Sequence, residues 1–111
     1  VLPLDADNLI QPTFLERCLE SLEETGAAAT FSTIAQFGGA QGTISASPWI
    51  PGRFTHGNYI DAMALIRKAA WAHVGGYRPM ETTGWEDFEL WCRFLEHGLW
   101  AAWNPEPLAS Y

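Results

Sequence analysis

The sequence predicts an α/β fold in which a mixed, mostly parallel sheet is flanked by helices. Apolar stretches of strand length alternate along the chain with stretches whose apolar residues recur at helical spacing. This alternation is typical of a layered fold in which helices connect parallel strands. The chain has 111 residues, of which 48% are hydrophobic and 14% aromatic, so we expect residues 1–111 to form a single domain with a substantial core.

The first strands and the first helix are predicted from apolar runs and their boundary residues. A short buried strand is expected at residues 1–4. Pro12 suits the first turn of a helix with one apolar face, and Gly26 is typical of the residue that ends such a helix. Residues 27–36 are rich in Ala, Thr and β-branched residues, which favour a second strand.

The middle of the chain predicts a long loop followed by a strand and a short helix. Residues 37–57 contain many Gly and Pro residues and no strong periodicity, so we expect a loop there, with one short strand at residues 43–45. A strand is expected at residues 59–66, where alternate residues are apolar. A helix is expected at residues 67–74, ending at Gly75.

The last predicted elements are one helix and one strand. Residues 86–97 have helical periodicity and are followed by Gly98, so a helix is expected there. A strand is expected at residues 99–103. Pro105 and Pro107 are expected to end it, because proline cannot donate a hydrogen bond to a strand ladder.

The charge of the chain argues against two classes of partner. Six basic and thirteen acidic residues give a formal net charge of −7. Nucleic acids and anionic membranes are bound through clustered cations, so we expect neither to be recognised through bulk charge. An acidic chain remains suited to binding cations or neutral sugars.

The ends of the chain and its hydropathy predict where the protein works. The sequence opens with Val1 instead of Met and lacks the features of a signal peptide, so we expect it to be part of a longer protein. No run approaches the roughly 18 apolar residues of a membrane-spanning helix. Neither Asn58 nor Asn104 lies in a glycosylation motif, which favours a bacterial or cytoplasmic setting. We expect any contact with the inner face of the membrane to be made by parts of the parent chain outside this sequence.

Asp5 and Asp7 form the first candidate site. They follow the strand predicted at residues 1–4, so their carboxylates are expected at the end of a strand. Hard oxygen ligands of this kind suit Mg²⁺ or Mn²⁺. A polar turn that leads into the next helix is the competing interpretation. An EF-hand calcium loop would also place acids at these positions, but Ile10 stands where such a loop needs Gly.

The second candidate site lies at the start of the helix predicted at residues 86–97. The helix dipole favours ionised acids there, so a charged first turn with a structural role is one interpretation of Glu86 and Asp87. Neighbouring helical side chains diverge by about 100°, so only one of the two acids is expected to face a site. A carboxylate beside the apolar Trp85 and Phe88 is suited to accept a proton from a hydroxyl group, which is the role of a general base.

Three motifs occur in a fixed order along the chain. They are Asp5-Ala6-Asp7 after an apolar run, a strand into an Arg-containing helix that ends at Gly75-Gly76-Tyr77, and Gly84-Trp85-Glu86-Asp87 leading into Leu90-Trp91-Cys92-Arg93. In this order the sequence resembles the C-terminal half of the catalytic domain of family 2 glycosyltransferases. The resemblance covers nearly the whole chain and implies a partial GT-A (Rossmann-like) fold. The nucleotide-binding elements with which the family's domain begins would precede Val1.

The resemblance implies a function and a role for each site residue. The implied reaction is the metal-dependent transfer of a sugar from a nucleotide-diphosphate sugar to a hydroxyl group of a carbohydrate or lipid-linked acceptor, with inversion. By position, Asp7 resembles the ligand of Mg²⁺ or Mn²⁺, and Asp5 would contact the ribose or help to hold the metal. Asp87 resembles the catalytic base, with Glu86 and Trp85 lining the donor-sugar or acceptor site.

Two other functions remain open at this point. One is a non-catalytic carbohydrate-binding or assembly module that retains the transferase fold, and the other is a structural domain stabilised by a metal ion. If the chain is about half of a catalytic domain, we expect it to bind nucleotide sugar weakly or not at all by itself. Half of a sheet would also leave an unpaired edge, which predicts a homodimer through that edge.

Overall fold

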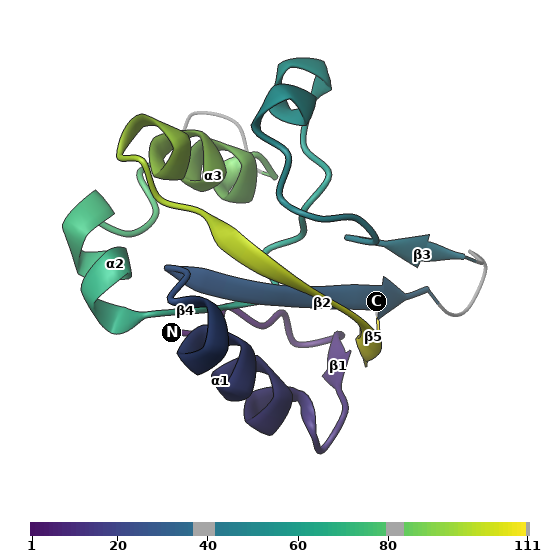
Figure 1. Ribbon diagram of the computed structural model, residues 1–111. Helices are drawn as coiled ribbons and strands as arrows, with labels where there is room; N and C mark the ends of the chain where they lie inside the picture. Colours follow the sequence, from purple (N-terminus) through teal and green to yellow (C-terminus); the bar gives the residue numbers. More distant parts are fainter. Residues whose placement is uncertain (37–41, 80–83, 111) are drawn as a thin grey trace.

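A mixed sheet lies at the centre of the protein in the computed structural model, which describes residues 1–36, 42–79 and 84–110 (Figure 1). Within these residues five strands and four helices form a compact α/β domain. In chain order they are β1 (Leu9–Ile10), α1 (Phe14–Thr25), β2 (Ala29–Ala35), β3 (Thr43–Ile44), η1 (Pro51–His56), β4 (Ala64–Ile66), α2 (Lys68–Val74), α3 (Glu86–Glu96) and β5 (Ala101–Ser110). The predicted α/β class is confirmed.

The sheet has the strand order β1-β5-β2-β3, and β4 also pairs with β2. β2 and β5 are parallel, whereas β1, β3 and β4 each pair antiparallel with their neighbour. The prediction of a mostly parallel sheet is therefore wrong for the described residues. Parallel pairing needs a long crossover, which α2 and α3 supply between β2 and β5. β3 follows β2 after only residues 36–42, too few for such a crossover, and pairs antiparallel with it.

Helices cover both faces of the sheet. α1 lies on one face, and α3 and η1 lie over the other (Figure 1). Phe14 and Cys18 of α1 pack in one apolar cluster with Ile34 of β2. On the opposite face, Phe31 of β2 packs in a second cluster with Trp91 of α3. No helix in the described ranges is long and apolar enough to cross a membrane.

The end of α1 is stabilised by a residue that is distant in the sequence. Gly26 adopts a left-handed conformation with φ of 69° and ends the helix, as predicted. Arg67 reaches across from the start of α2, with Nε donating to the Ala27 carbonyl at 2.7 Å and Nη2 to the Leu22 carbonyl at 2.6 Å. Because carbonyl groups at a helix end have few partners, Arg67 ties α1 to α2.

The strand expected at residues 1–4 is absent from the structure. Val1 and Ile66 still exchange two backbone hydrogen bonds, of 2.7 and 2.8 Å. Pro3 lacks the N–H that would continue this pairing, so the segment lies beside β4 without forming a strand.

The strand expected at residues 59–66 is confined to β4, its last three residues. Asp61 Oδ1 accepts a hydrogen bond from the Met63 N–H at 2.9 Å, and this turn bends the chain before β4 begins. The alternation expected of a strand is lost at this bend, because Met63 is buried and Ala62 is half-buried.

β5 continues through Pro105 and Pro107, so the prediction that these prolines end the strand is wrong. The register with β2 shifts between Asn104 and Pro107, and Pro105 and Glu106 bulge out of the ladder, where both are exposed. Asn104 Oδ1 accepts the Glu106 N–H at 2.9 Å within this bulge. Proline is tolerated here because the ladder is already interrupted.

The region expected to be a long loop contains structure of its own. The predicted short strand is present as β3, whereas residues 37–41 lie outside the described residues. η1 is an additional helix that starts with Pro51. Its Phe54 is buried, with ring centroids 4.9 Å from Trp49 and 4.8 Å from Tyr59. The Phe54 ring also lies 6.3 Å from that of Phe88 in α3, so aromatic packing holds η1 beside α3.

Candidate functional site

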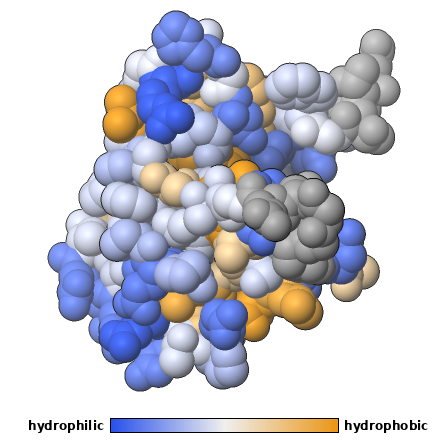
Figure 2. All heavy atoms as spheres, turned by 90° about the vertical axis from the view of Figure 1, so that its right-hand side faces the viewer, coloured by the Kyte–Doolittle hydropathy of each residue, from blue (hydrophilic) through white to orange (hydrophobic). Residues whose placement is uncertain are grey.

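A cleft of about 430 Å³ opens beside the N-terminus of α3. Its walls come from the segment that includes β3, from η1 and from residues 58–61, and its charged lining residues are Arg53, Asp61 and Asp87. Figure 2 faces the end of the sheet where β3 lies and shows hydrophilic residues gathered at the top of the molecule, at the height of η1. The cleft therefore brings two carboxylates and one guanidinium together among polar and apolar lining residues.

Asp87, the predicted catalytic residue, lies in the first turn of α3 and lines this cleft. Its Oδ1 accepts the Phe88 N–H at 2.8 Å, and its Oδ2 accepts Nδ2 of Asn58 at 3.1 Å. Burial raises the pKa of Asp87 above its ordinary 3.8, the Phe88 N–H lowers it, and the charges of Asp61 and Glu86 raise it further. A carboxylate with a raised pKa holds an abstracted proton more strongly, which suits a general base.

Asn58 orients the Asp87 carboxylate. Its Nδ2 donates to Asp87, and its Oδ1 accepts the Ile60 N–H at 3.4 Å. A carboxylate only accepts and a backbone N–H only donates, so these two contacts fix which way the amide points. Trp91 Nε1 donates to the Ile60 carbonyl at 3.0 Å and ties residues 58–61 to α3. Asn58 and Asp87 therefore sit on segments that are bound to each other.

Asp61 is a cleft residue that the sequence motifs do not single out. Its N–H donates to Ser45 Oγ at 2.9 Å, in addition to the turn that its carboxylate makes with Met63. Burial raises the pKa of Asp61, the Met63 N–H lowers it, and the charge of Asp5 raises it further. In the sequence, Asp61 is a single acid within an apolar run. The alternating pattern predicted for a strand there places it on a polar face, which gives no sign of a site.

Asp5 does not line the cleft, but its charge acts on Asp61 and on Tyr77. Burial raises the pKa of Tyr77, and four negative charges raise it further: Asp87, Glu86, Asp61 and Asp5. The charge of Asp5 therefore acts on the same side chain as the charges of the cleft acids. Asp7 lies with Asp5 in an exposed turn that the Asn8 N–H closes on the Asp5 carbonyl at 3.1 Å. Among the described residues, the Asp7 carboxylate has no hydrogen-bond or ion-pair partner, and it does not line the cleft.

Glu86 and Trp85 flank Asp87 at the start of α3. Glu86 Oε2 accepts the Gly84 N–H at 2.9 Å, whereas Asp87 lines the cleft, so the two neighbouring acids face different partners. Trp85 is 52% exposed, and its ring lies 6.0 Å from that of Phe88. An exposed indole of this kind offers an apolar face and a polar N–H to a ligand.

The chemistry of these acids fits a hard divalent cation. The charge of Asp5 acts on Asp61 and that of Asp61 acts on Asp87, and a bound cation would offset this repulsion. Among residues 1–36, 42–79 and 84–110, no three His, Cys, Asp or Glu side chains gather as a complete metal site. Because Mg²⁺ often takes one or two carboxylates and completes its coordination with phosphate and water, the cation stays a prediction.

Two other hollows lack this combination of groups. The larger, of about 530 Å³, lies beside the C-terminal end of α1, and its described lining contains no carboxylate. The smaller, of about 300 Å³, is an apolar hollow beside Trp85 and Phe88. We place the candidate site in the cleft of Asp61 and Asp87 because chemistry, not volume, distinguishes it.

Comparison with known proteins does not assign the chain to a family. A scan against known protein families finds no match. No curated protein matches the sequence. The resemblance to family 2 glycosyltransferases therefore remains a prediction that rests on the motifs and their order.

Proposed function

We propose that the chain is the metal- and acceptor-binding half of a glycosyltransferase catalytic domain with a partial GT-A fold. It transfers a sugar from a nucleotide-diphosphate sugar to a hydroxyl group of a carbohydrate or lipid-linked acceptor, with inversion at the anomeric carbon. The observation that carries this proposal is the placement of Asp87 in a cleft, with both carboxylate oxygens held and its pKa raised.

The role of Asp87 in this reaction is that of general base. The acceptor hydroxyl gives its proton to the Asp87 carboxylate while its oxygen attacks the anomeric carbon of the donor. The bond from that carbon to the diphosphate oxygen breaks, and its electron pair leaves with the nucleoside diphosphate. Attack opposite the leaving group inverts the configuration, and Asp87 then releases its proton to water.

The hydrogen bonds to Asp87 support this role through orientation. Asn58 and the Phe88 N–H each hold one oxygen, so the carboxylate is already oriented before the substrate binds. Each oxygen keeps a further lone pair, because a carboxylate accepts about four hydrogen bonds in all. The base therefore remains available to an acceptor hydroxyl in the cleft.

Asp5 and Asp7 would hold Mg²⁺ or Mn²⁺ in this proposal, and Trp85 and Glu86 would line the sugar-binding region. When bound, the cation offsets the negative charge that develops on the departing diphosphate. The part of Asp5 is supported by its charge, which acts on Asp61 and raises the pKa of that cleft acid. The part of Asp7 rests on the motif.

The proposal is tested by a transfer assay on the longest protein that contains this chain. We expect sugar transfer from a nucleotide sugar in the presence of Mn²⁺ or Mg²⁺, loss of transfer with a chelator, and a product of inverted anomeric configuration by NMR. A product of retained configuration would contradict the role of Asp87. Carbohydrate binding without turnover of any nucleotide sugar would favour the non-catalytic module instead.

A further inference from the structure

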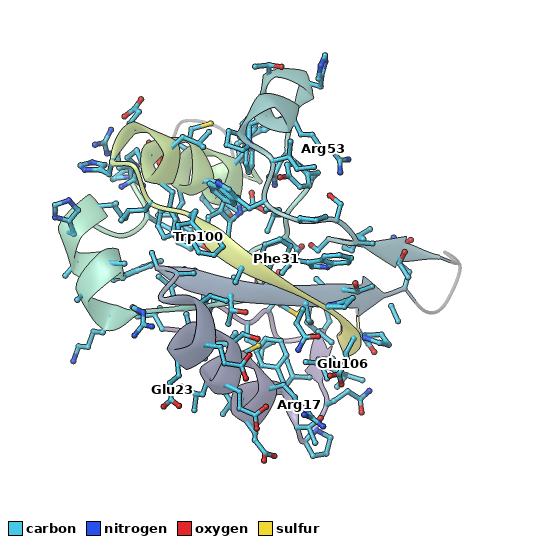
Figure 3. All side chains as sticks on the ribbon, in the orientation of Figure 1. Arg17, Glu23, Phe31, Arg53, Trp100 and Glu106 are labelled. Atoms are coloured by element: carbon cyan, nitrogen blue, oxygen red, sulfur yellow. The ribbon has the colours of Figure 1, made fainter. Side chains whose placement is uncertain are left out.

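Arg53 supplies the positive charge in the described lining of the cleft. It comes from η1, whose Phe54 is buried against Trp49 and Tyr59. Figure 3 shows its side chain extending from η1 on the side of the fold where β3 lies. Arg53 is therefore carried on a backbone that is fixed to the core, although its own side chain is exposed.

The guanidinium group of Arg53 is held in place by two neighbours. It lies 4.2 Å from the centroid of the Tyr59 ring, and its Nη1 donates to Ser47 Oγ. Tyr59 is fixed in turn, because its hydroxyl accepts the Ile50 N–H at 2.6 Å and donates to the Pro48 carbonyl at 3.1 Å. A side chain that is ordered before a ligand arrives loses less conformational entropy on binding.

The charge of Arg53 is not neutralised within the described residues, although the chain carries thirteen acids. The ion pairs between described residues use three other arginines: Arg17, Arg78 and Arg93. Asp61 and Asp87 line the same cleft but form no ion pair with Arg53. A guanidinium has five N–H donors, and among the described residues its side-chain partner is Ser47 alone.

We propose that Arg53 binds an anionic group of the substrate, a phosphoryl or a carboxylate, at its side of the cleft. A guanidinium forms paired, charge-assisted hydrogen bonds with both groups. Asp61 and Asp87 repel an anion, so the substrate is oriented with its anionic group at Arg53 and an uncharged hydroxyl at Asp87. Under the proposed function, on which this part rests, the anionic group is the donor diphosphate or the carboxylate of an acidic sugar.

Anion binding is measured by ¹H–¹⁵N NMR on the longest protein that contains this chain, titrated separately with inorganic pyrophosphate, glucuronate and uncharged glucose. We expect pyrophosphate or glucuronate, but not glucose, to shift the N–H signals of Arg53, Ser47 and Tyr59. A response to pyrophosphate identifies the diphosphate as the source of the anionic group, and a response to glucuronate identifies an acidic sugar.

Three variants test the role of Arg53. Arg53→Gln should weaken binding of the responding anion by about tenfold or more, since it removes paired hydrogen bonds to a charged group. Arg53→Lys should weaken it less, because a point charge remains. Arg17→Gln is the matched control, because Arg17 is exposed, pairs with Glu106, and lies at the opposite end of the molecule from Arg53 (Figure 3). It should bind like the wild type.

The outcomes separate this inference from the proposed function. If neither anion shifts the cleft signals, or if Arg53→Gln binds as well as the wild type, the inference is wrong even in an active glycosyltransferase. If binding depends on Arg53 but the full protein transfers no sugar, the inference stands and the proposed function fails. Thermal melting checks that each variant is folded. If Arg53→Gln is unfolded, the weaker anion binding expected of Arg53→Lys tests the inference instead.

Discussion

Replacing Arg93 with Ala should destabilise the protein by about 3 kcal/mol, at the lower end of the range for breaking a buried ion pair. The Arg93 side chain is 2% exposed and donates to both carboxylate oxygens of Glu89 at 2.6–2.8 Å. It also donates to the carbonyls of Val74 and Gly76, where α2 ends. The substitution leaves these carbonyls without a donor and leaves Glu89, which is 26% exposed, without its buried partner.

The magnitude is large for a chain of this length, whose total stability is expected to be roughly 5–15 kcal/mol. The free energy of unfolding is measured by urea titration with tryptophan fluorescence. Arg78→Ala is the matched control, because Arg78 contacts the same Glu89 at 3.6 Å but is 62% exposed. It should lose at most about 1 kcal/mol. Equal losses in Arg78→Ala and Arg93→Ala would refute the reasoning that burial makes the difference.

Three further predictions concern the cleft acids and the assembly. The folded state binds the proton of Asp61 more tightly than the unfolded state, so stability falls as pH rises from 3.8 through the raised pKa. Asp61→Asn should therefore raise the free energy of unfolding at neutral pH but not in acid. Urea unfolding measures this free energy at both pH values, and an equal change at both would contradict the prediction. Asn58→Ala removes a donor to the charged form of Asp87 and should raise the pKa of Asp87 further, which carboxyl ¹³C NMR checks; an unchanged pKa would show that Asn58 does not hold the carboxylate. The predicted homodimer should give the mass of two chains by light scattering, and the mass of a single chain would refute the prediction of a dimer.

The helices are the part of the fold that the sequence predicts best. α2 and α3 lie within one residue of the expected ranges, and Gly26 and Gly75 end their helices in left-handed conformations. α1 begins at Phe14, just after Pro12, which the sequence predicts in its first turn. Helical periodicity and a terminal glycine are local signals, so they do not depend on which strands come together. η1 is too short to show helical periodicity, so Pro51 is the local signal for it.

The strands are predicted less well because pairing is decided by distant parts of the chain. Nothing local to Pro105 and Pro107 shows that they fall at a register shift opposite β2. In the same way, the direction of each pairing depends on the connection that precedes it. The class of the fold is therefore predictable, but the mostly parallel sheet is not found.

The candidate site is predicted in part. The motif around Asp87 places an acid at the start of α3, and the structure puts this acid in a cleft. Asp61 is missed, and Arg53, which could approach a phosphate by its charge alone, is not selected as a site residue, because the importance of both depends on folding. Asp61 is drawn inward by contacts with Ser45 and Met63, and Arg53 is aligned by the ring of Tyr59.

The turnover number of Asp87→Asn tests the central claim, that Asp87 is the general base of a sugar transfer, most directly. It is compared with the wild type and with Glu23→Gln, a variant of an exposed acid on α1, in the longest protein that contains this chain (Figure 3). The account predicts a fall in kcat of roughly 10²–10⁴-fold for Asp87→Asn, with little change in KM for the donor, and no change for Glu23→Gln. A wild-type kcat for Asp87→Asn would contradict it.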